Sequence, residues 1–176
     1  ALGSLKEGWQ ELYLDLASAE LIGSGVDLSR INWFRIYGEL AGDVTILIDD
    51  VRAENGKPDD GEKEERTVIH NCDGTENITN IFGESGVTLA TAAGEFAEGT
   101  GAFKNAGFGQ IRYHIVLTNP VDISKHQAGT LQFYLYVGNK SQFTSTDMTV
   151  EISRSGNADV NELSWNILLS DLKEGW

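Results

Sequence analysis

Residues 131–137 read Leu-Gln-Phe-Tyr-Leu-Tyr-Val, and this run decides the fold class. The run alternates as a β-strand does, and Leu131, Phe133 and Leu135 fall on one face. The other face also carries large rings, Tyr134 and Tyr136. A strand that is apolar on both faces is typical of the centre of a sheet whose outer side is covered or used in binding. We therefore expect a β-protein in which the tyrosine face is either buried or a binding platform.

Further segments on both sides of this run show the same alternation, separated by Gly, Asn, Asp or Ser. The eight additional candidate strands cover residues 10–16, 31–37, 44–52, 77–82, 87–91, 110–118, 148–154 and 162–168. No segment is long enough to form a convincing helix. Nine short strands with long connections predict an all-β fold, a jelly-roll β-sandwich.

Composition narrows the function classes. The chain has 176 residues with 27 acidic and 13 basic side chains, so its net charge is −14. This charge repels phosphate backbones and anionic lipid surfaces, and it argues against a nucleic-acid partner. No apolar run is long enough for insertion into a membrane. Cys72 is the single cysteine, which excludes an internal disulfide framework and a cysteine-based zinc site.

A five-residue repeat indicates how the chain is organised. Leu-Lys-Glu-Gly-Trp occurs at residues 5–9 and again at residues 172–176. Self-similarity at this spacing predicts tandem repeats of whole-domain size, with the chain starting and ending at the same point of successive repeats. Residues 53–68 contain few large apolar side chains and predict an acidic linker. Residues 1–52 would then be the closing strands of one repeat and 69–176 the opening strands of the next, together forming one sandwich.

Several motifs resemble those of a known family. They are the Gly8-Trp9 turn, the strand Trp33-Phe34-Arg35-Ile36-Tyr37, the segment Ile48-Asp49-Asp50-Val51, and Gly99-Thr100-Gly101-Ala102-Phe103-Lys104 before the strand at 131–137. The chain is similar in these motifs to jelly-roll carbohydrate-binding modules of bacterial extracellular proteins. Its closing strands come first, so the resemblance implies a circularly permuted sandwich or one completed by strand exchange between chains.

The resemblance also implies a function and a location. It predicts a non-catalytic module that binds polysaccharide, in a secreted or cell-surface bacterial protein, with neighbouring repeats as further partners. Repetition would raise avidity. Two alternatives stay open: a structural spacer or adhesion repeat without sugar binding, and a β-sandwich glycoside hydrolase or lyase. We expect no enzyme, because His70, His114 and His126 show no metal-ligand spacing and no catalytic motif is present.

A structural calcium ion is a further implication of the resemblance, which assigns it to Asp49. Calcium binds six to eight oxygen ligands, and Asp73, Glu76 and Glu98 are the expected co-ligands. The alternative is that these acidic residues lie on solvated turns.

Candidate sugar-binding residues follow from strand parity and from the way sugars bind, by stacking on aromatic rings and by hydrogen bonds to polar groups. The predicted set is Tyr13, Trp33, Arg35, Tyr37, Arg112, His114, Gln132, Tyr134 and Tyr136. Trp165 shares its parity with apolar neighbours and is expected in the core. Phe103 and Phe108 lie in a glycine-rich segment and are expected at an exposed rim.

Overall fold

The computed structural model describes residues 8–55, 65–82, 86–107, 110–155 and 160–174. The described residues contain twelve strands: β1 (Trp9–Asp15), β2 (Glu20–Ile22), β3 (Ile31–Glu39), β4 (Val44–Glu54), β5 (Arg66–His70), β6 (Ile78–Phe82), β7 (Val87–Ala90), β8 (Ala102–Gly107), β9 (Gln110–Val121), β10 (Thr130–Val137), β11 (Asp147–Ser153) and β12 (Glu162–Leu168). Five short 3-10 turns connect them: η1 (Leu16–Ser18), η2 (Leu28–Arg30), η3 (Ser124–His126), η4 (Lys140–Gln142) and η5 (Leu169–Asp171).

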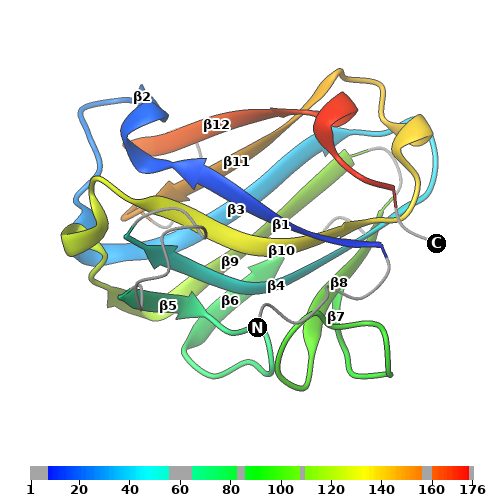
Figure 1. Ribbon diagram of the computed structural model, residues 1–176, viewed down its shortest axis with the longest axis horizontal. Helices are drawn as coiled ribbons and strands as arrows, with labels where there is room; N and C mark the ends of the chain where they lie inside the picture. Colours follow the sequence, from blue (N-terminus) through cyan, green and yellow to red (C-terminus); the bar gives the residue numbers. More distant parts are fainter. Residues whose placement is uncertain (1–7, 56–64, 83–85, 108–109, 156–159, 175–176) are drawn as a thin grey trace.

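The strands form two antiparallel sheets that pack face to face (Figure 1). Sheet A has the order β1-β10-β4-β8-β7, and β5 also pairs with β4. Sheet B has the order β2-β12-β11-β3-β9-β6. The prediction of an all-β sandwich is therefore confirmed, and each of the nine predicted strands is present. The sequence pattern missed β2, β5 and β8.

The core lies between the sheets and is built by alternation. The inward side chains of β10, Leu131, Phe133 and Leu135, are fully buried. Phe133 meets Phe34 of β3 edge-on with 5.4 Å between ring centroids, which links the two sheets. Trp165 of β12 is also in the core, as predicted, and its indole N–H donates to the Asp15 carbonyl at 2.9 Å.

In each sheet, strands of residues 9–54 pair with strands of residues 66–168. In sheet A, β1 and β4 flank β10, and in sheet B, β3 lies between β9 and β11. The leading strands thus pair with later strands of the same chain. Within the predicted linker, residues 53–54 belong to β4 and residues 66–68 to β5, and residues 56–64 lie outside the described residues. Residues 1–7 and 175–176 lie outside the described residues, so part of each copy of the five-residue repeat does too.

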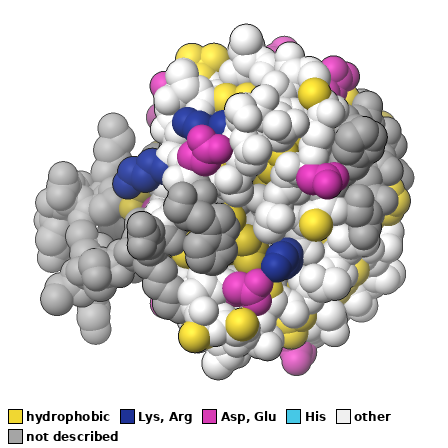
Figure 2. All heavy atoms as spheres, turned by 90° about the vertical axis from the view of Figure 1, so that its right-hand side faces the viewer, with side chains coloured by type: hydrophobic (Ala, Val, Ile, Leu, Met, Phe, Trp, Pro, Cys, Tyr) yellow, Lys and Arg dark blue, Asp and Glu magenta, His cyan; other side chains and the backbone are white. Residues whose placement is uncertain are grey.

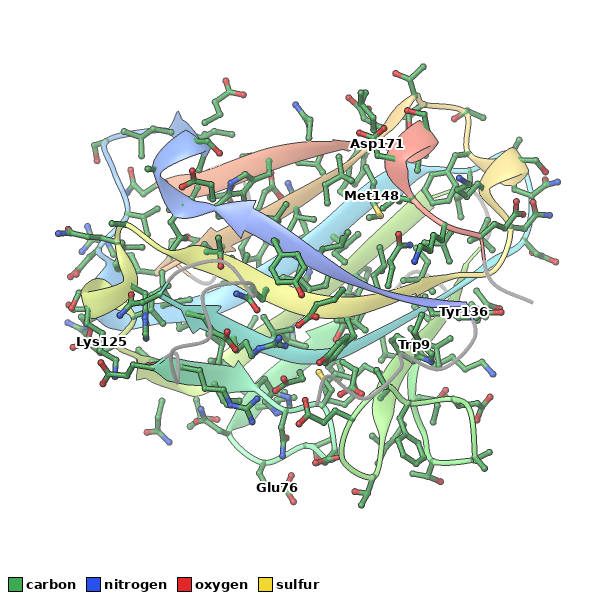
Figure 3. All side chains as sticks on the ribbon, viewed as in Figure 1. Trp9, Glu76, Lys125, Tyr136, Met148 and Asp171 are labelled. Atoms are coloured by element: carbon green, nitrogen blue, oxygen red, sulfur yellow. The ribbon has the colours of Figure 1, made fainter. Side chains whose placement is uncertain are left out.

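A second apolar cluster lies on the outer face of sheet A, beneath the segment at residues 91–101. Trp9, Leu47, Ala90, Ala102 and Tyr136 form it, and Phe96, Ala97 and Tyr134 pack against it. Figure 3 shows Trp9 and Tyr136 side by side on this face, and their ring centroids are 6.0 Å apart. The indole N–H of Trp9 donates to the Gly94 carbonyl at 3.1 Å, which holds the covering segment down. The tyrosine face of β10 is therefore buried at one end.

The prediction of an exposed rim was wrong for Phe103. This residue lies in β8, which the glycine-rich sequence did not reveal, and pairing with β4 turns its ring into the core. Its ring stacks on His70 with centroids 5.3 Å apart. Phe108 lies outside the described residues.

The surface carries charges of both signs. Figure 2 views the end of the sandwich that lies at the right of Figure 1, where acidic and basic side chains are scattered and in places adjacent. Among the described residues, no helix has the length and apolar character needed to cross a membrane.

Candidate functional site

A break along one edge of β4 creates a polar site in the described structure. On this edge β8 pairs with residues 44–48 of β4, and β5 pairs with residues 51–54. Asp49 and Asp50 lie between the two partners, and Asp50 has the positive φ of 46° that marks a bulge. The bulge directs two successive carboxylates away from the core at the point where the sheet edge opens.

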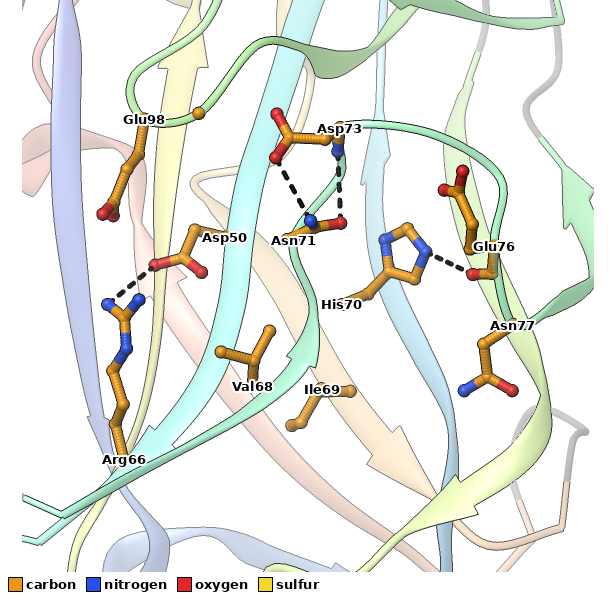
Figure 4. Close-up of a pocket in the computed structure, with 11 residues that line it drawn as sticks. Asp50, Arg66, Val68, Ile69, His70, Asn71, Asp73, Glu76, Asn77 and Glu98 are labelled. Atoms are coloured by element: carbon orange, nitrogen blue, oxygen red, sulfur yellow. Dashed lines mark hydrogen bonds and ion pairs between the residues drawn. The ribbon is translucent and has the colours of Figure 1, made fainter.

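A pocket of about 550 Å³ lies beside this break. Its lining comes from β4, β5, the turn after β5 and the segment before β8: Asp50, Arg66, Val68, Ile69, His70, Asn71, Asp73, Glu76, Asn77, Glu98 and Gly99 (Figure 4). Four carboxylates and one guanidinium share this pocket, so its electrostatic potential is negative and favours cations and hydroxyl donors.

Asp49 fixes the segment that borders the pocket. Its Oδ2 atom accepts the main-chain N–H groups of Ala97 and Glu98, both at 2.9 Å. Its Oδ1 atom is buried and finds no hydrogen-bond partner in the described structure. Burial raises the pKa of the Asp49 carboxyl to about 7, although the two N–H donors lower it. An uncompensated buried oxygen of this kind is a site for a proton or a cation.

Asp50 and Glu98 point toward one another across the mouth of the pocket (Figure 4). Burial is the main reason that the pKa of Asp50 is raised to about 6, and the adjacent Glu98 carboxyl raises it further. Arg52 opposes this, because its Nη1 atom lies 2.8 Å from Asp50 Oδ2. Arg66 lies farther away, at 3.8 Å from the same oxygen.

Asp73 and His70 organise the far wall. Asp73 Oδ1 accepts the N–H groups of Thr100 and Gly101, so this carboxylate already has main-chain partners. The Nδ1 atom of His70 accepts the Cys72 N–H at 3.0 Å, so its Nε2 atom carries the proton and donates to the Glu76 carbonyl at 3.0 Å. Burial lowers the pKa of His70, which favours this neutral form.

A network centred on Arg52 connects the pocket to the outer face of sheet A. Besides Asp50, the guanidinium pairs with Glu54 at 2.6 Å and with Glu11 of β1. The Tyr13 hydroxyl donates to Glu11, and its ring is 39% exposed. Arg52 also lies over the ring of Tyr134, 5.1 Å from its centroid. Burial and the charge of Glu11 raise the pKa of Tyr134 to about 12. Burial and the hydrogen bond to Glu11 also raise the pKa of Tyr13, so both phenols stay neutral.

The predicted sugar-binding residues divide between two opposite faces. Tyr13, Gln132, Tyr134 and Tyr136 lie on the outer face of sheet A, whereas Trp33, Arg35, Tyr37 and His114 lie on the outer face of sheet B. On sheet B, Arg35 pairs with Glu151 and lies over the rings of Trp33 and Tyr37, at 5.2 and 5.7 Å from their centroids. Arg112 lies in β9, and its side chain is outside the described part. One ligand site cannot include both groups.

Burial removes three residues of the predicted set from the accessible surface. Trp33 is 2% exposed, and Gln132 and Tyr136 are 1% exposed. Gln132 accepts a hydrogen bond from Arg52 at 3.0 Å, and Tyr136 packs on Trp9. All three side chains are buried in this structure, which alternation along a single strand does not reveal.

The predicted calcium ligands come from distant segments, and the structure brings them to one place. Asp73, Glu76 and Glu98 line the pocket, and Asp49 adjoins it through the Glu98 N–H. Within the described residues, however, no three His, Cys, Asp or Glu side chains are arranged so that they could hold a metal ion.

Sequence reasoning missed Asp50, Arg66, Arg52 and Glu11. Asp50 follows Asp49 directly and was part of the quoted motif, but only the bulge turns it to the pocket. Arg66 lay in the predicted linker. The role of Arg52 depends on pairing between β1, β10 and β4, which no local signal encodes.

We compared the chain with protein-family models, with curated proteins and with solved structures, and no match was found in any of the three comparisons. The site itself is therefore the basis for a functional conclusion.

Proposed function

We propose that the chain is a non-catalytic carbohydrate-binding module that binds a polysaccharide over the outer face of sheet A, next to the acidic pocket. One observation supports this most strongly. Tyr13 offers an exposed ring beside the charged side chains of Glu11 and Arg52. Aromatic rings stack on the CH faces of sugars, and charged groups bind their hydroxyls. The pocket at Asp50 and Glu98 would take hydroxyls of a sugar unit that extends past Tyr134.

Calcium is part of the same proposal. Asp49 Oδ1, Asp50 and Glu98 supply the hard oxygen donors that calcium prefers, and the orphaned Asp49 oxygen is the structural feature that suits a cation. Glu98 already points toward Asp50, and because its side chain is exposed it can adjust to complete a site with water and main-chain carbonyl oxygens. The ion would hold the segment at residues 97–99 against β4 and so shape the pocket.

The wider setting proposed for the module is a secreted or cell-surface bacterial protein that carries it in tandem copies. A single exposed platform gives weak binding, and linked copies raise the effective concentration of further sites. The alternative of a spacer or adhesion repeat predicts the same fold with no affinity for polysaccharide.

Affinity electrophoresis against soluble polysaccharides tests the proposal, with calcium and with a chelator in parallel gels. The opposite faces provide a matched pair of variants. Tyr13→Ala removes a ring from sheet A, and Tyr37→Ala removes a ring from sheet B. We expect at least one polysaccharide to retard the wild type, Tyr13→Ala to abolish the retardation, and Tyr37→Ala to preserve it.

Other outcomes would overturn the proposal in specific ways. Loss of retardation only in Tyr37→Ala would move the site to sheet B. No retardation of a folded sample would favour the spacer. A reducing-sugar assay on each retarding polysaccharide tests for hydrolysis, and steady product release would replace the non-catalytic reading with a glycoside hydrolase.

A further inference from the structure

A second pocket, of about 340 Å³, lies at one end of sheet B, remote from the acidic pocket. The start of β3 meets the ends of β9 and β11 and the start of β12 there, at the left of Figure 1. Its lining residues are Arg30, Asn32, Pro120, Arg154, Ser155 and Asn161. Among the described residues, no acidic side chain lines it, in a chain of net charge −14.

The two arginines of this pocket differ from the other arginines whose side chains the structure describes. Arg35, Arg52 and Arg66 each have a carboxylate partner. Arg30 and Arg154 form no ion pair and no side-chain hydrogen bond with the described residues. Two guanidinium groups that share a pocket and have no carboxylate partner among the described residues can bind an anion, because each presents a planar fork of N–H donors.

Asp27 is the nearby carboxylate that competes for these cations. Its pKa is lowered chiefly by the hydroxyl and N–H of Ser29, which donate to its Oδ1 at 2.6 and 3.1 Å, and to a lesser degree by Arg154 and Arg30. The Asp27 carboxylate is thus already hydrogen-bonded within its own turn at η2. Among the described residues, nothing else pairs with the two guanidinium groups, so they are left for a ligand.

The two asparagine side chains of this pocket indicate which other groups the ligand carries besides its negative charge. Asn161 Oδ1 accepts the Ser24 N–H and hydroxyl at 2.8 and 2.9 Å, so the amide NH₂ of Asn161 is left to donate. Asn32 Oδ1 is buried and has no hydrogen-bond partner in the described structure. A buried acceptor without a donor is costly, and a ligand hydroxyl would satisfy it.

We propose that this pocket binds a hexuronate: Arg30 and Arg154 hold the carboxylate, and Asn32 accepts a hydrogen bond from a ring hydroxyl. The volume is at the lower end of the usual range for ligand pockets, which suits one sugar unit. A singly charged carboxylate is favoured over a doubly charged phosphate, because the acidic protein repels the second charge. The site is separate from the platform on sheet A and does not depend on it.

Isothermal titration of the whole chain with glucuronate, at low ionic strength, tests the site. Glucose has hydroxyls but no carboxylate, acetate has a carboxylate but no hydroxyl, and inorganic phosphate is a dianion. We expect glucuronate to bind and each of the other three to bind at least about tenfold more weakly, since each lacks one of the two interactions or adds a repelled charge.

Three variants assign the binding to the pocket. Arg30→Gln and Arg154→Gln should each weaken glucuronate binding by about tenfold or more, since each removes a charged hydrogen-bond donor. Lys173→Gln loses the same charge at the opposite end, where only the main chain of Lys173 bonds Gln10, and should bind as the wild type does. Both arginines are exposed, so these variants should fold normally, and thermal unfolding checks this.

The proposal is overturned if either arginine variant binds glucuronate as tightly as Lys173→Gln does. It is also overturned if acetate or phosphate binds as tightly as glucuronate, because the site would then recognise negative charge without the sugar hydroxyls. Tyr13→Ala separates this inference from the function proposed above: it should lose retardation by polysaccharide and keep glucuronate binding, and loss of both would contradict the independence of the two sites.

Discussion

The Oδ2 atom of Asp49 lies 2.9 Å from the main-chain nitrogen of Glu98, and this bond ties the segment before β8 to the open edge of β4. A second bond from the Ala97 N–H reaches the same oxygen. The Asp49 carboxylate is itself buried, and its Oδ1 atom has no hydrogen-bond partner among the described residues. This one side chain therefore contributes both to the stability of the segment before β8 and to the shape of the pocket.

The first prediction concerns pH and Asp49. The folded protein keeps the Asp49 proton up to a pKa of about 7, whereas the unfolded chain releases it near 4. Between these values the unfolded state binds fewer protons, so this carboxyl lowers the free energy of unfolding as pH rises. The variant Asp49→Asn retains an acceptor oxygen but does not titrate. Its free energy of unfolding should therefore fall less than that of the wild type between pH 4.5 and pH 7.5, by more than about 1 kcal/mol.

Urea unfolding at pH 4.5 and at pH 7.5 measures the effect. The difference between wild type and variant is the quantity to compare, because His70, with its lowered pKa, has the opposite pH dependence. Asp43→Asn removes an exposed carboxylate and serves as the control. An identical pH dependence in wild type and Asp49→Asn would contradict the prediction.

The second prediction concerns calcium. Calcium should raise the thermal unfolding temperature by a few degrees, because a ligand that binds only the folded state stabilises it. The rise should be larger at pH 8 than at pH 5.5, since Asp49 and Asp50 have pKa values of about 7 and about 6 and must be ionised to bind the ion. Differential scanning calorimetry with calcium and with a chelator provides the measurement, and Asp50→Asn should abolish the rise. An equal rise at both pH values, or in Asp50→Asn, would show that the ion binds elsewhere.

The third prediction concerns Arg52. This buried guanidinium pairs with Glu11, Asp50 and Glu54, so Arg52→Gln leaves three carboxylates without their shared cation. We expect a loss of about 3 kcal/mol or more in the free energy of unfolding at pH 7.5. Lys104→Gln breaks a more exposed pair with Glu95 and should cost less than about 1 kcal/mol. Comparable losses in urea titrations of the two variants would mean that the network contributes little.

The fourth prediction concerns Gly99, which has a φ of 63° and whose added Cβ would collide with the Asp73 carboxylate. Gly99→Ala should lower the free energy of unfolding by about 1 to 3 kcal/mol, through the left-handed backbone and the collision together. Gly86 also has a positive φ, of 85°, but a Cβ there meets nothing within 4 Å. Gly86→Ala therefore reports the backbone cost alone. If Gly86→Ala is as destabilising as Gly99→Ala, the contact with Asp73 is not a constraint.

Local patterns in the sequence predicted much of the fold. Alternation identified β10 and eight other strands, and it assigned Phe133 and Trp165 to the core, because side chains of a strand alternate between its faces whatever the partner is. The same rule failed for β8, where glycine and asparagine weaken the strand signal and the strand forms through pairing with β4. Phe103 was misplaced for that reason.

The sequence by itself determined a two-sheet β-protein with an excess of acidic side chains. It also pointed to Asp73, Glu76 and Glu98 as neighbours of Asp49 at a predicted calcium site. Only the tertiary structure decided that Tyr13 and Tyr37 lie on opposite outer faces, that Tyr136 is covered, and that Arg52 is surrounded by carboxylates. Parity along a strand depends on neighbouring residues, whereas sheet membership depends on pairing between residues far apart in the chain. The outward face of a strand is therefore readable from sequence, and what that face meets is not.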